Sequence, residues 1–289
     1  MSPTLAPRAH YDAVAAEAAA RVIAGYSTSF GWACRLLDEP VRGQVRSVYA
    51  LVRVADEIVD GPFADDDRAR TLRLLDTLEQ TTLEAVRTGY STDLVVHAFA
   101  VAARAGRIDD ALITPFFASM RADLTVTEHD DASLQEYVHG SAEVVGLMCL
   151  RLFLAGTPDP DAAYAALSPG AVRLGAAFQK VNFLRDVGAD QQGLGRLYLP
   201  GTEPGTLTDA DRDRLLDDID ADLAAAARAI DDLPSSSRRA VRLAHDLFAE
   251  LSRRLRRTPA SELLTTRVRV PDVVKARLLA RVLLTGGRR

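Results

Sequence analysis

Apolar residues recur at steps of three and four along most of this chain, and that helical period is the feature that most restricts its fold. The clearest example opens at Pro40 and ends at the stop signal Asp60–Pro62. Its apolar positions are Val41, Val45, Val48, Leu51, Val52, Ala55 and Val59. Strand-like alternation extends no further than Arg267–Val270. We therefore predict an all-α protein.

Other segments with the same period predict further helices. They are 13–24, 66–89, 91–106, 134–155 and 169–190, a helix capped by Thr208, and a last helix from about Asp272 to Gly286. The segment 134–155 is apolar on most faces, so we expect it to be central. No internal repeat or long linker interrupts the pattern. One domain over 1–289 is predicted, with residues 1–12 flexible.

Composition narrows the class of protein. With 289 residues, 48% of them hydrophobic, the chain can bury a large core. It contains no run of about 20 uncharged apolar residues, the length of a membrane-spanning helix, and its start has no signal-peptide pattern. A cytoplasmic protein is expected. The two cysteines, Cys34 and Cys149, form no Cys-x-x-Cys pair, so we expect buried, inert thiols rather than a zinc site or a disulfide.

Charge is unevenly distributed along the chain. The net charge of −5 argues against a nucleic-acid-binding protein. Residues 235–289 nevertheless hold 14 Arg and Lys against 4 Asp and Glu, which is +10 and leaves −15 for the rest. This basic region could attract diphosphate or anionic lipid, and we predict a peripheral contact with the inner surface of a membrane. A solvated arginine-rich face is the alternative.

Asp56 and Asp60 stand four residues apart on the helix that opens at Pro40, so both carboxylates lie on one face, one turn apart. Their neighbours include Ala55, Ile58 and Val59. Carboxylates next to an apolar interior require a cation or a hydrogen-bond partner. Such pairs are common on solvated helices, and this one alone is a weak indication of a site.

A second acidic segment repeats the spacing far along the chain. Asn182, Asp186 and Asp190 fall on successive turns, and Gln179 lies near the same face. Oxygen ligands of this kind suit Mg²⁺, which prefers sites shared with substrate phosphates. Two carboxylate helices could therefore hold several metal ions around one diphosphate. The alternative is two unrelated polar edges.

These segments, in this order, resemble the squalene/phytoene synthase family. The matching segments are Tyr26–Phe30, Tyr49–Asp60, Tyr137–Gly146, Gln179–Asp190 and Gly195–Pro200. The resemblance implies the isoprenoid synthase fold, with antiparallel helices around a central cavity. It also implies Mg²⁺ as the metal, with Mn²⁺ as a substitute, and two prenyl diphosphates as substrates.

The resemblance also assigns roles to individual residues. The catalytic residues would be Asp56, Asp60, Asp186 and Asp190, and the metal ligands would be those four with Asn182. Substrate would be bound by Tyr26, Ser27, Thr28, Ser29, Tyr49, Arg53, Gln179, Asn182, Arg185, Arg196 and Tyr198. A structural role in the turn before Pro200 is the alternative for Tyr198. The apolar segments 116–117 and 147–154 would line the cavity, or belong to the ordinary core.

The implied reaction is a head-to-head condensation of two geranylgeranyl diphosphates through a cyclopropyl diphosphate to phytoene, without NADPH. A squalene or dehydrosqualene synthase acting on farnesyl diphosphate is one alternative. A non-catalytic subunit that binds prenyl diphosphates, or a helical scaffold with surface acids, is another. Three departures from the family pattern bear on the product: Thr28 replaces a lysine, Ser141–Glu143 replaces Val-Ala-Gly, and Ser261 replaces an aromatic residue.

Overall fold

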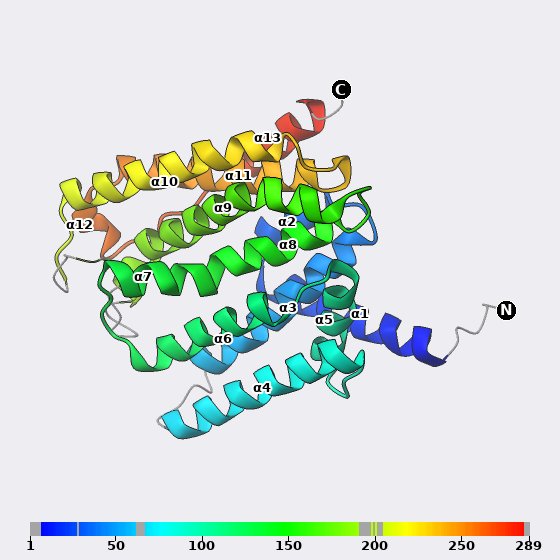
Figure 1. Ribbon diagram of the computed structural model, residues 1–289. Helices are drawn as coiled ribbons and strands as arrows, with labels where there is room; N and C mark the ends of the chain where they lie inside the picture. Colours follow the sequence, from blue (N-terminus) through cyan, green and yellow to red (C-terminus); the bar gives the residue numbers. More distant parts are fainter. Residues whose placement is uncertain are drawn as a thin grey trace.

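The computed structural model describes residues 7–27, 29–61, 67–190, 198, 200 and 205–285. Within these ranges the secondary structure is helical and contains no β-strand (Figure 1). The predicted all-α class is therefore confirmed. The helices are α1 (Pro7–Tyr26), α2 (Ser29–Cys34), α3 (Val41–Asp60), α4 (Arg68–Thr88), α5 (Leu94–Gly106), α6 (Asp110–Thr125), α7 (Asp131–Val138), the π-helix η1 (His139–Glu143), α8 (Val144–Leu154), α9 (Pro160–Ala189), α10 (Asp209–Ile230), α11 (Ser235–Arg257), α12 (Ala260–Leu263) and α13 (Asp272–Thr285).

Most predicted helices are present, but α9 is longer than its sequence indicates. It begins at Pro160, where the Asp159 side chain accepts a hydrogen bond from the backbone N–H of Ala162. Pro169, the expected first residue, lies inside the helix. That expectation was wrong because Asp159 and Pro160 already form a complete start signal, a capping acid followed by proline at the first position.

The apolar segment expected to be central is a continuous run of α7, η1 and α8. Helix α8 packs against α3, α5, α6 and α9. The run Asp131–Leu154 is long and apolar enough to cross a membrane by length and composition, and half of its most apolar window is buried inside the protein. Burial among four neighbouring helices accounts for its composition.

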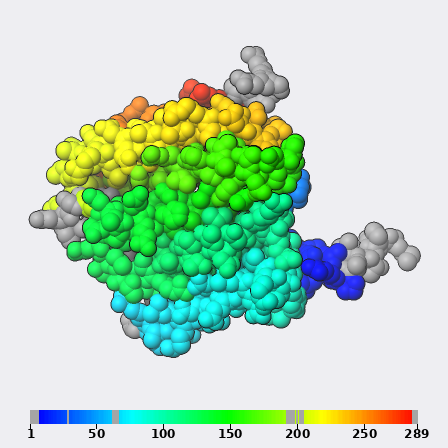
Figure 2. All heavy atoms as spheres, in the orientation of Figure 1, coloured from blue at the N-terminus to red at the C-terminus, as the bar shows by residue number. Residues whose placement is uncertain are grey.

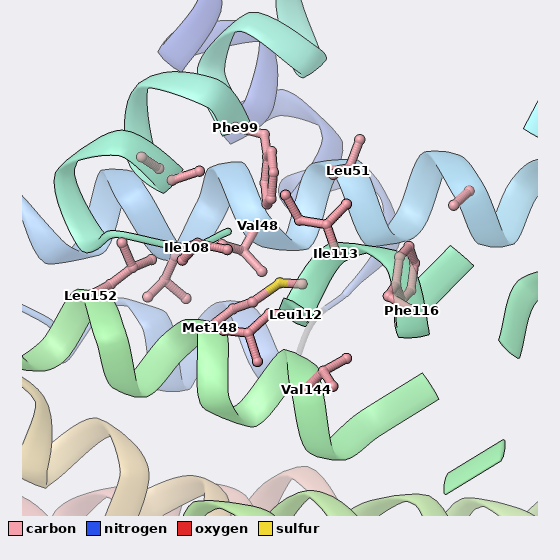
Figure 3. Close-up of a cluster of buried hydrophobic side chains, with 14 of the residues drawn as sticks. Val48, Leu51, Phe99, Ile108, Leu112, Ile113, Phe116, Val144, Met148 and Leu152 are labelled. Atoms are coloured by element: carbon pink, nitrogen blue, oxygen red, sulfur yellow. The ribbon is translucent and has the colours of Figure 1, made fainter. Parts of the chain in front are cut away.

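The main core fills the space between α3, α5, α6 and α8 (Figure 3). Leu51, Phe99, Ile113 and Met148 meet there, each at most 2% exposed. The aromatic pair 116–117 belongs to this core, with exposures of 1% and 0%, and does not line the cavity described below. The pair could have lined the cavity or belonged to the ordinary core, and the structure places it in the core.

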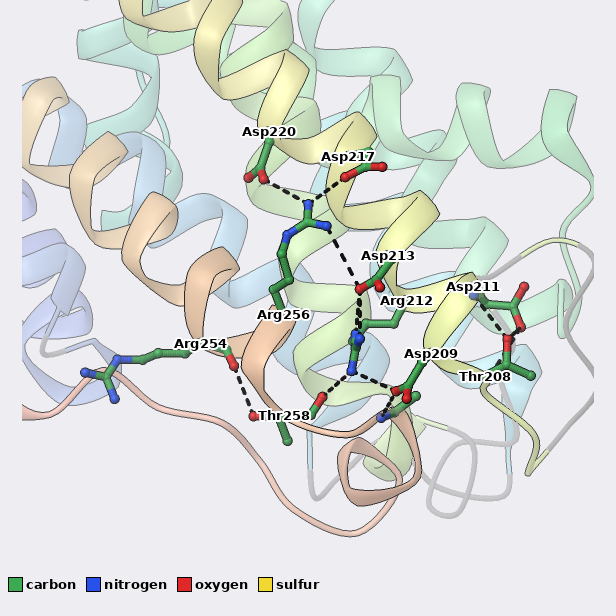
Figure 4. A network of polar contacts seen from close by, with 11 residues as sticks. Thr208, Asp209, Asp211, Arg212, Asp213, Asp217, Asp220, Arg254, Arg256 and Thr258 are labelled. Atoms are coloured by element: carbon green, nitrogen blue, oxygen red, sulfur yellow. Dashed lines mark hydrogen bonds and ion pairs between the residues drawn. The ribbon is translucent and has the colours of Figure 1, made fainter.

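A polar network joins α10 to the end of α11 (Figure 4). Arg256 pairs with Asp217 at 2.8 Å and with Asp220 at 3.0 Å. Arg212, which is 8% exposed, donates to the carbonyl of Thr258 at 2.7 Å and pairs with Asp209. These contacts hold the chain as it leaves α11 and leads through α12 to residues 264–267.

The first turn of α1 projects from the body of the protein (Figures 1 and 2). Helix α1 begins at Pro7, inside the segment 1–12. The Tyr11 hydroxyl donates to the carbonyl of Ser91 at 2.9 Å, and Asp12 Oδ1 lies 2.7 Å from Nε2 of the buried His97. Helix α1 is therefore attached to α5 from its second turn onward.

Two glycines provide a matched test of the packing around η1. A Cβ at Gly140 would lie 2.1 Å from Ser119 Oγ and 2.2 Å from the carbonyl oxygen of Pro115, whereas a Cβ at Gly25 would meet nothing within 4 Å. We expect Gly140→Ala to lower the free energy of unfolding by about 1–3 kcal/mol through overpacking. Gly25→Ala, inside α1, should raise it by about 0.5–1 kcal/mol. Urea denaturation measures both, and equal effects of the two substitutions would contradict the close approach of η1 and α6.

Candidate active site

An apolar cavity of about 260 Å³ lies among α2, α3, η1, α8, α9, α10 and α11. Its lining is made of alanine, valine, leucine, isoleucine, phenylalanine and glycine, with one hydroxyl, from Ser141, and the thiols of Cys34 and Cys149. Burial raises the pKa of both thiols to about 12, so they are protonated at neutral pH. Such a wall offers almost nothing to which water or an ion could bind.

Both acidic motifs continue helices that line this cavity. Val52 of α3 and Phe178 of α9 face the cavity. Asp56 follows Val52 by four residues, and Asn182 and Asp186 follow Phe178 by four and eight. Residues four apart lie on one helix face, so each polar set extends an apolar stripe. The carboxyl ends of α3 and α9 point to the same end of the bundle, on the left in Figure 1. Folding thus brings the two sequence motifs to one end of one cavity.

A cluster of predicted substrate-binding residues surrounds the first motif. The guanidinium of Arg53 lies over the ring of Tyr26, 4.3 Å from its centroid. Tyr49 stacks on Phe30 with ring centroids 5.4 Å apart, and Ser27 Oγ accepts a hydrogen bond from the backbone N–H of Phe30 at 3.2 Å. These contacts hold the end of α1 and the start of α2 against α3.

Arg53 neutralises the first motif. It forms ion pairs with Asp56 and with Glu57, a residue that was not among the predicted site residues. Burial opposes the charge on Arg53, but the hydrogen bond to Glu57 and the charges of Asp56 and Glu57 outweigh it, so the pKa of the guanidinium is raised. Its Nε is buried without a hydrogen-bond partner in the described part of the chain. The two ion pairs use the terminal nitrogens of Arg53 and leave this donor unused among the described residues.

Burial also raises the pKa of Tyr49, and the charge of Arg53 and a hydrogen bond with Ser27 offset only part of that effect. The phenol is therefore protonated at neutral pH and remains a hydrogen-bond donor.

Two arginines neutralise the second motif. Asp186 pairs with the adjacent Arg185 and with Arg267, whose Nε lies 2.7 Å from Asp186 Oδ1. The Arg267–Asp186 ion pair depends on a close approach of the α9 backbone to the segment that precedes Arg267. A Cβ at Gly188 would lie 2.1 Å from the carbonyl oxygen of Leu264. Sequence analysis gave Arg267 no role in the site. It is 81 residues from Asp186, and only folding joins them.

Tyr198 is buried, and its hydroxyl donates to Oδ1 of Asp123 at 2.8 Å. Tyr137 donates to the other carboxylate oxygen at 3.0 Å. The Tyr198 ring stacks on Phe183 of α9 with centroids 4.5 Å apart. Asp123, at 9% exposure, is a buried acid that was not predicted as a site residue, since no second acid lies three or four residues from it in α6. This environment is that of a structural tyrosine.

The remaining predicted residues are placed as follows. Asn182, Gln179 and Asp190 are half-buried on α9 or at its end, and Asp60 is exposed at the last position of α3. Thr28 and Arg196 lie outside the described residues, as does the side chain of Ser29. Over the described ranges no three His, Cys, Asp or Glu side chains are grouped closely enough to hold a metal ion by themselves.

The altered segment 141–143 affects the cavity only through its first two residues. Ser141 and Ala142 line it, while Glu143 turns to His139, whose Nδ1 lies 2.9 Å from Glu143 Oε2. Ser141 Oγ is buried, with no partner among the described residues. Ser261 is exposed.

Known proteins with the same sequence pattern identify the family. A family model described as squalene/phytoene synthase matches residues 23–273. The chain belongs to the squalene/phytoene synthase family. Phytoene synthase of Mycobacterium tuberculosis is 32% identical over 209 residues, 69% of this chain and 63% of that protein. The 4,4'-diapophytoene synthase of Staphylococcus haemolyticus is 29% identical over 179 residues, 62% of this chain and 59% of that protein. The chain thus spans about three fifths of the length of these curated relatives.

Solved structures in the family share the fold. A dehydrosqualene synthase in complex with a ligand superposes with a TM-score of 0.81, at 24% identity over 97% of this chain and 99% of that one. The squalene synthase HpnC from Alicyclobacillus acidocaldarius gives a TM-score of 0.72, at 22% identity over 85% of this chain and 94% of that one. The isoprenoid synthase fold expected from the sequence is confirmed.

Tyr198→Phe separates a structural tyrosine from a substrate-binding one. Asp123 keeps the hydrogen bond from Tyr137 and loses the one from Tyr198, so the free energy of unfolding should fall by about 1–3 kcal/mol. The Michaelis constant for the prenyl diphosphate should not change. Tyr164→Phe is the control, because the Tyr164 ring lies under Arg151 and its hydroxyl has no hydrogen bond in the part of the chain described. Unchanged stability together with weaker substrate binding would place Tyr198 at the substrate instead.

Proposed function

We propose that this chain is a Mg²⁺-dependent phytoene synthase, which condenses two geranylgeranyl diphosphates head to head. One observation carries the proposal: two Asp-x-x-x-Asp motifs, on α3 and α9, extend helix faces that line one apolar cavity, and both lie at the same end of it. That arrangement suits a substrate with a diphosphate at one end and a long hydrocarbon at the other. The curated relatives named phytoene synthase support the choice of reaction.

The donor atoms fit magnesium. Asp56, Asp60, Asn182, Asp186 and Asp190 offer only oxygen atoms, the ligands of a hard cation. No described cluster of three acidic or imidazole side chains preforms a metal cage. This agrees with the usual behaviour of Mg²⁺, which binds through one or two carboxylates together with substrate phosphates. When bound, Mg²⁺ would neutralise the charge that develops on the departing diphosphate.

The chain's own residues would bind and orient the diphosphate. Arg53 has an unused buried Nε, and Tyr49 is a protonated donor on the same face. Arg185 and Arg267 form ion pairs with Asp186. Both could pair with phosphate oxygens instead, since a planar guanidinium suits phosphate as well as carboxylate. The arginines would thus exchange carboxylate partners for phosphate partners when substrate and metal enter together.

The cavity would protect the carbon chemistry from water. Departure of the first diphosphate with its bonding electron pair leaves an allylic cation, which the double bond of the second substrate attacks. Proton loss closes a cyclopropyl diphosphate, and a second ionisation, rearrangement and proton loss give the hydrocarbon. Water in the cavity would capture either cation as an alcohol. The nearly uniform apolar lining supports this sequence, which requires no NADPH.

A squalene- or dehydrosqualene-type reaction on farnesyl diphosphate is the second candidate. Two observations favour it: a diapophytoene synthase is among the relatives, and a dehydrosqualene synthase superposes over nearly the whole chain. The two candidates differ in substrate length, and only the squalene-forming version of the second would also consume a reductant.

Product analysis decides between the two substrates. We expect purified protein with Mg²⁺ to convert the C20 diphosphate to a C40 hydrocarbon without NADPH, and Mn²⁺ to replace Mg²⁺. Mass spectrometry of the extracted hydrocarbons identifies the product. A C30 product formed from the C15 substrate alone would overturn the choice of substrate. No hydrocarbon from either substrate, with or without NADPH, would favour a non-catalytic binding protein.

Loss of either acidic motif should abolish ionisation without unfolding the protein. We expect Asp56→Asn and Asp186→Asn each to lower diphosphate release by roughly a thousandfold, since several kcal/mol of charge stabilisation are lost and 1.4 kcal/mol corresponds to about tenfold. Stability should change by no more than about 1 kcal/mol, because these ion pairs are partly exposed. Asp232→Asn, an exposed acid beyond the end of α10, is the matched control and should retain full activity. Wild-type turnover in either motif variant would refute the metal site.

A further inference from the structure

Helix α13 carries an apolar stripe on its outer face. Val273 and Leu284 are 81% and 79% exposed, and Ala276 and Ala280 lie exposed between them at steps of three and four residues. This spacing places the four side chains on one helix face, and the exposed Leu283 adjoins them. We call these five residues the α13 stripe.

The α13 stripe is not part of the face by which the helix is attached. Leu278 and Val282 of α13 are buried against Ala33 of α2 and against Leu243 and Leu247 of α11. The C-terminal part of α13, red in Figures 1 and 2, lies at the outer edge of the molecule. Since α13 is held by its opposite face, the fold does not require apolar residues in the stripe.

Basic side chains flank the α13 stripe. Arg277 and Arg281 are exposed on the same helix. Over residues 267–285 there are five basic residues and one acidic residue, a net charge of 5 − 1 = +4, in a chain whose overall charge is −5. Apolar side chains bordered by arginine on an otherwise acidic protein match the pattern of helices that lie in the interface of an anionic membrane.

Helix α13 also lies directly outside a wall of the apolar cavity. Ala33 of α2 and Ala244 of α11 line the cavity. The same two alanines belong to, or pack against, the cluster that holds Leu278 and Val282. A membrane that docks on α13 would therefore lie on the side of the protein where α13 covers the cavity wall.

We propose that the α13 stripe docks on a membrane that contains anionic lipid, with its apolar residues at the acyl boundary and Arg277 and Arg281 at the phosphates. The biological reason rests on the proposed function, because a C40 or C30 hydrocarbon cannot leave into water. The docking itself rests on exposure, spacing and charge.

Vesicle flotation of the full chain tests the proposal. The probes are phosphatidylcholine vesicles, and vesicles of phosphatidylcholine and phosphatidylglycerol in equal parts. We expect binding to the anionic vesicles that weakens as salt is raised. Val273→Ser combined with Leu284→Ser should weaken it about tenfold, and Arg277→Gln about fivefold. Leu74→Ser on α4, at 48% exposure, is the matched control and should bind as the wild type does.

Three results would overturn the proposal. The wild-type chain could fail to bind vesicles at low salt, or the stripe variant could bind as well as the wild type. The third is a wild-type chain that binds no vesicles but forms a dimer, which the stripe variant converts to a monomer. Diphosphate release, measured in detergent without vesicles, reports the proposed function separately. Release without vesicle binding would refute docking alone, and vesicle binding without release would refute the chemistry alone.

Discussion

Carboxylates held beside an apolar cavity must be neutralised, and the rest of the site follows from that constraint. Arg53 neutralises Asp56, and Arg185 and Arg267 neutralise Asp186. Asp56 and Asp186 keep 39% and 21% of their side-chain surface exposed, so the nearby cations offset only the desolvation cost of the covered part. In the proposed function the same arginines would bind phosphate when metal takes the carboxylates, so one set of side chains would serve both the free protein and its substrate complex.

The helical architecture supplies the geometry for this exchange. Helices α3 and α9 each present apolar residues to the cavity and polar residues in the following turns. The apolar cavity therefore ends, and the acidic motifs begin, within one or two turns of the same helices. Helix α8 separates them and is buried among four neighbours. The polar network of Arg212 and Arg256 fixes the chain that returns Arg267 to Asp186 (Figure 4).

Local patterns made much of this predictable from sequence. The helical period of α3 and the four-residue spacing of its acids are visible without any knowledge of the fold. The features that could not be predicted from the sequence depend on contacts between distant residues. Tyr198 and Asp123 are 75 residues apart, and Arg267 reaches Asp186 across the approach of Gly188 to Leu264. The π-helix 139–143 is five residues long, too short to show a period in the sequence, and Phe116 could not be assigned to core or cavity by its type alone.

Calorimetric titration of the protein with inorganic pyrophosphate and Mg²⁺ tests most directly whether the two motifs act on one shared diphosphate. The account predicts that each ligand binds weakly alone, that each strengthens the other reciprocally, and that loss of either Asp56 or Asp186 removes this coupling. Pyrophosphate binding that is equally tight with and without Mg²⁺, or coupling that survives in both variants, would contradict it.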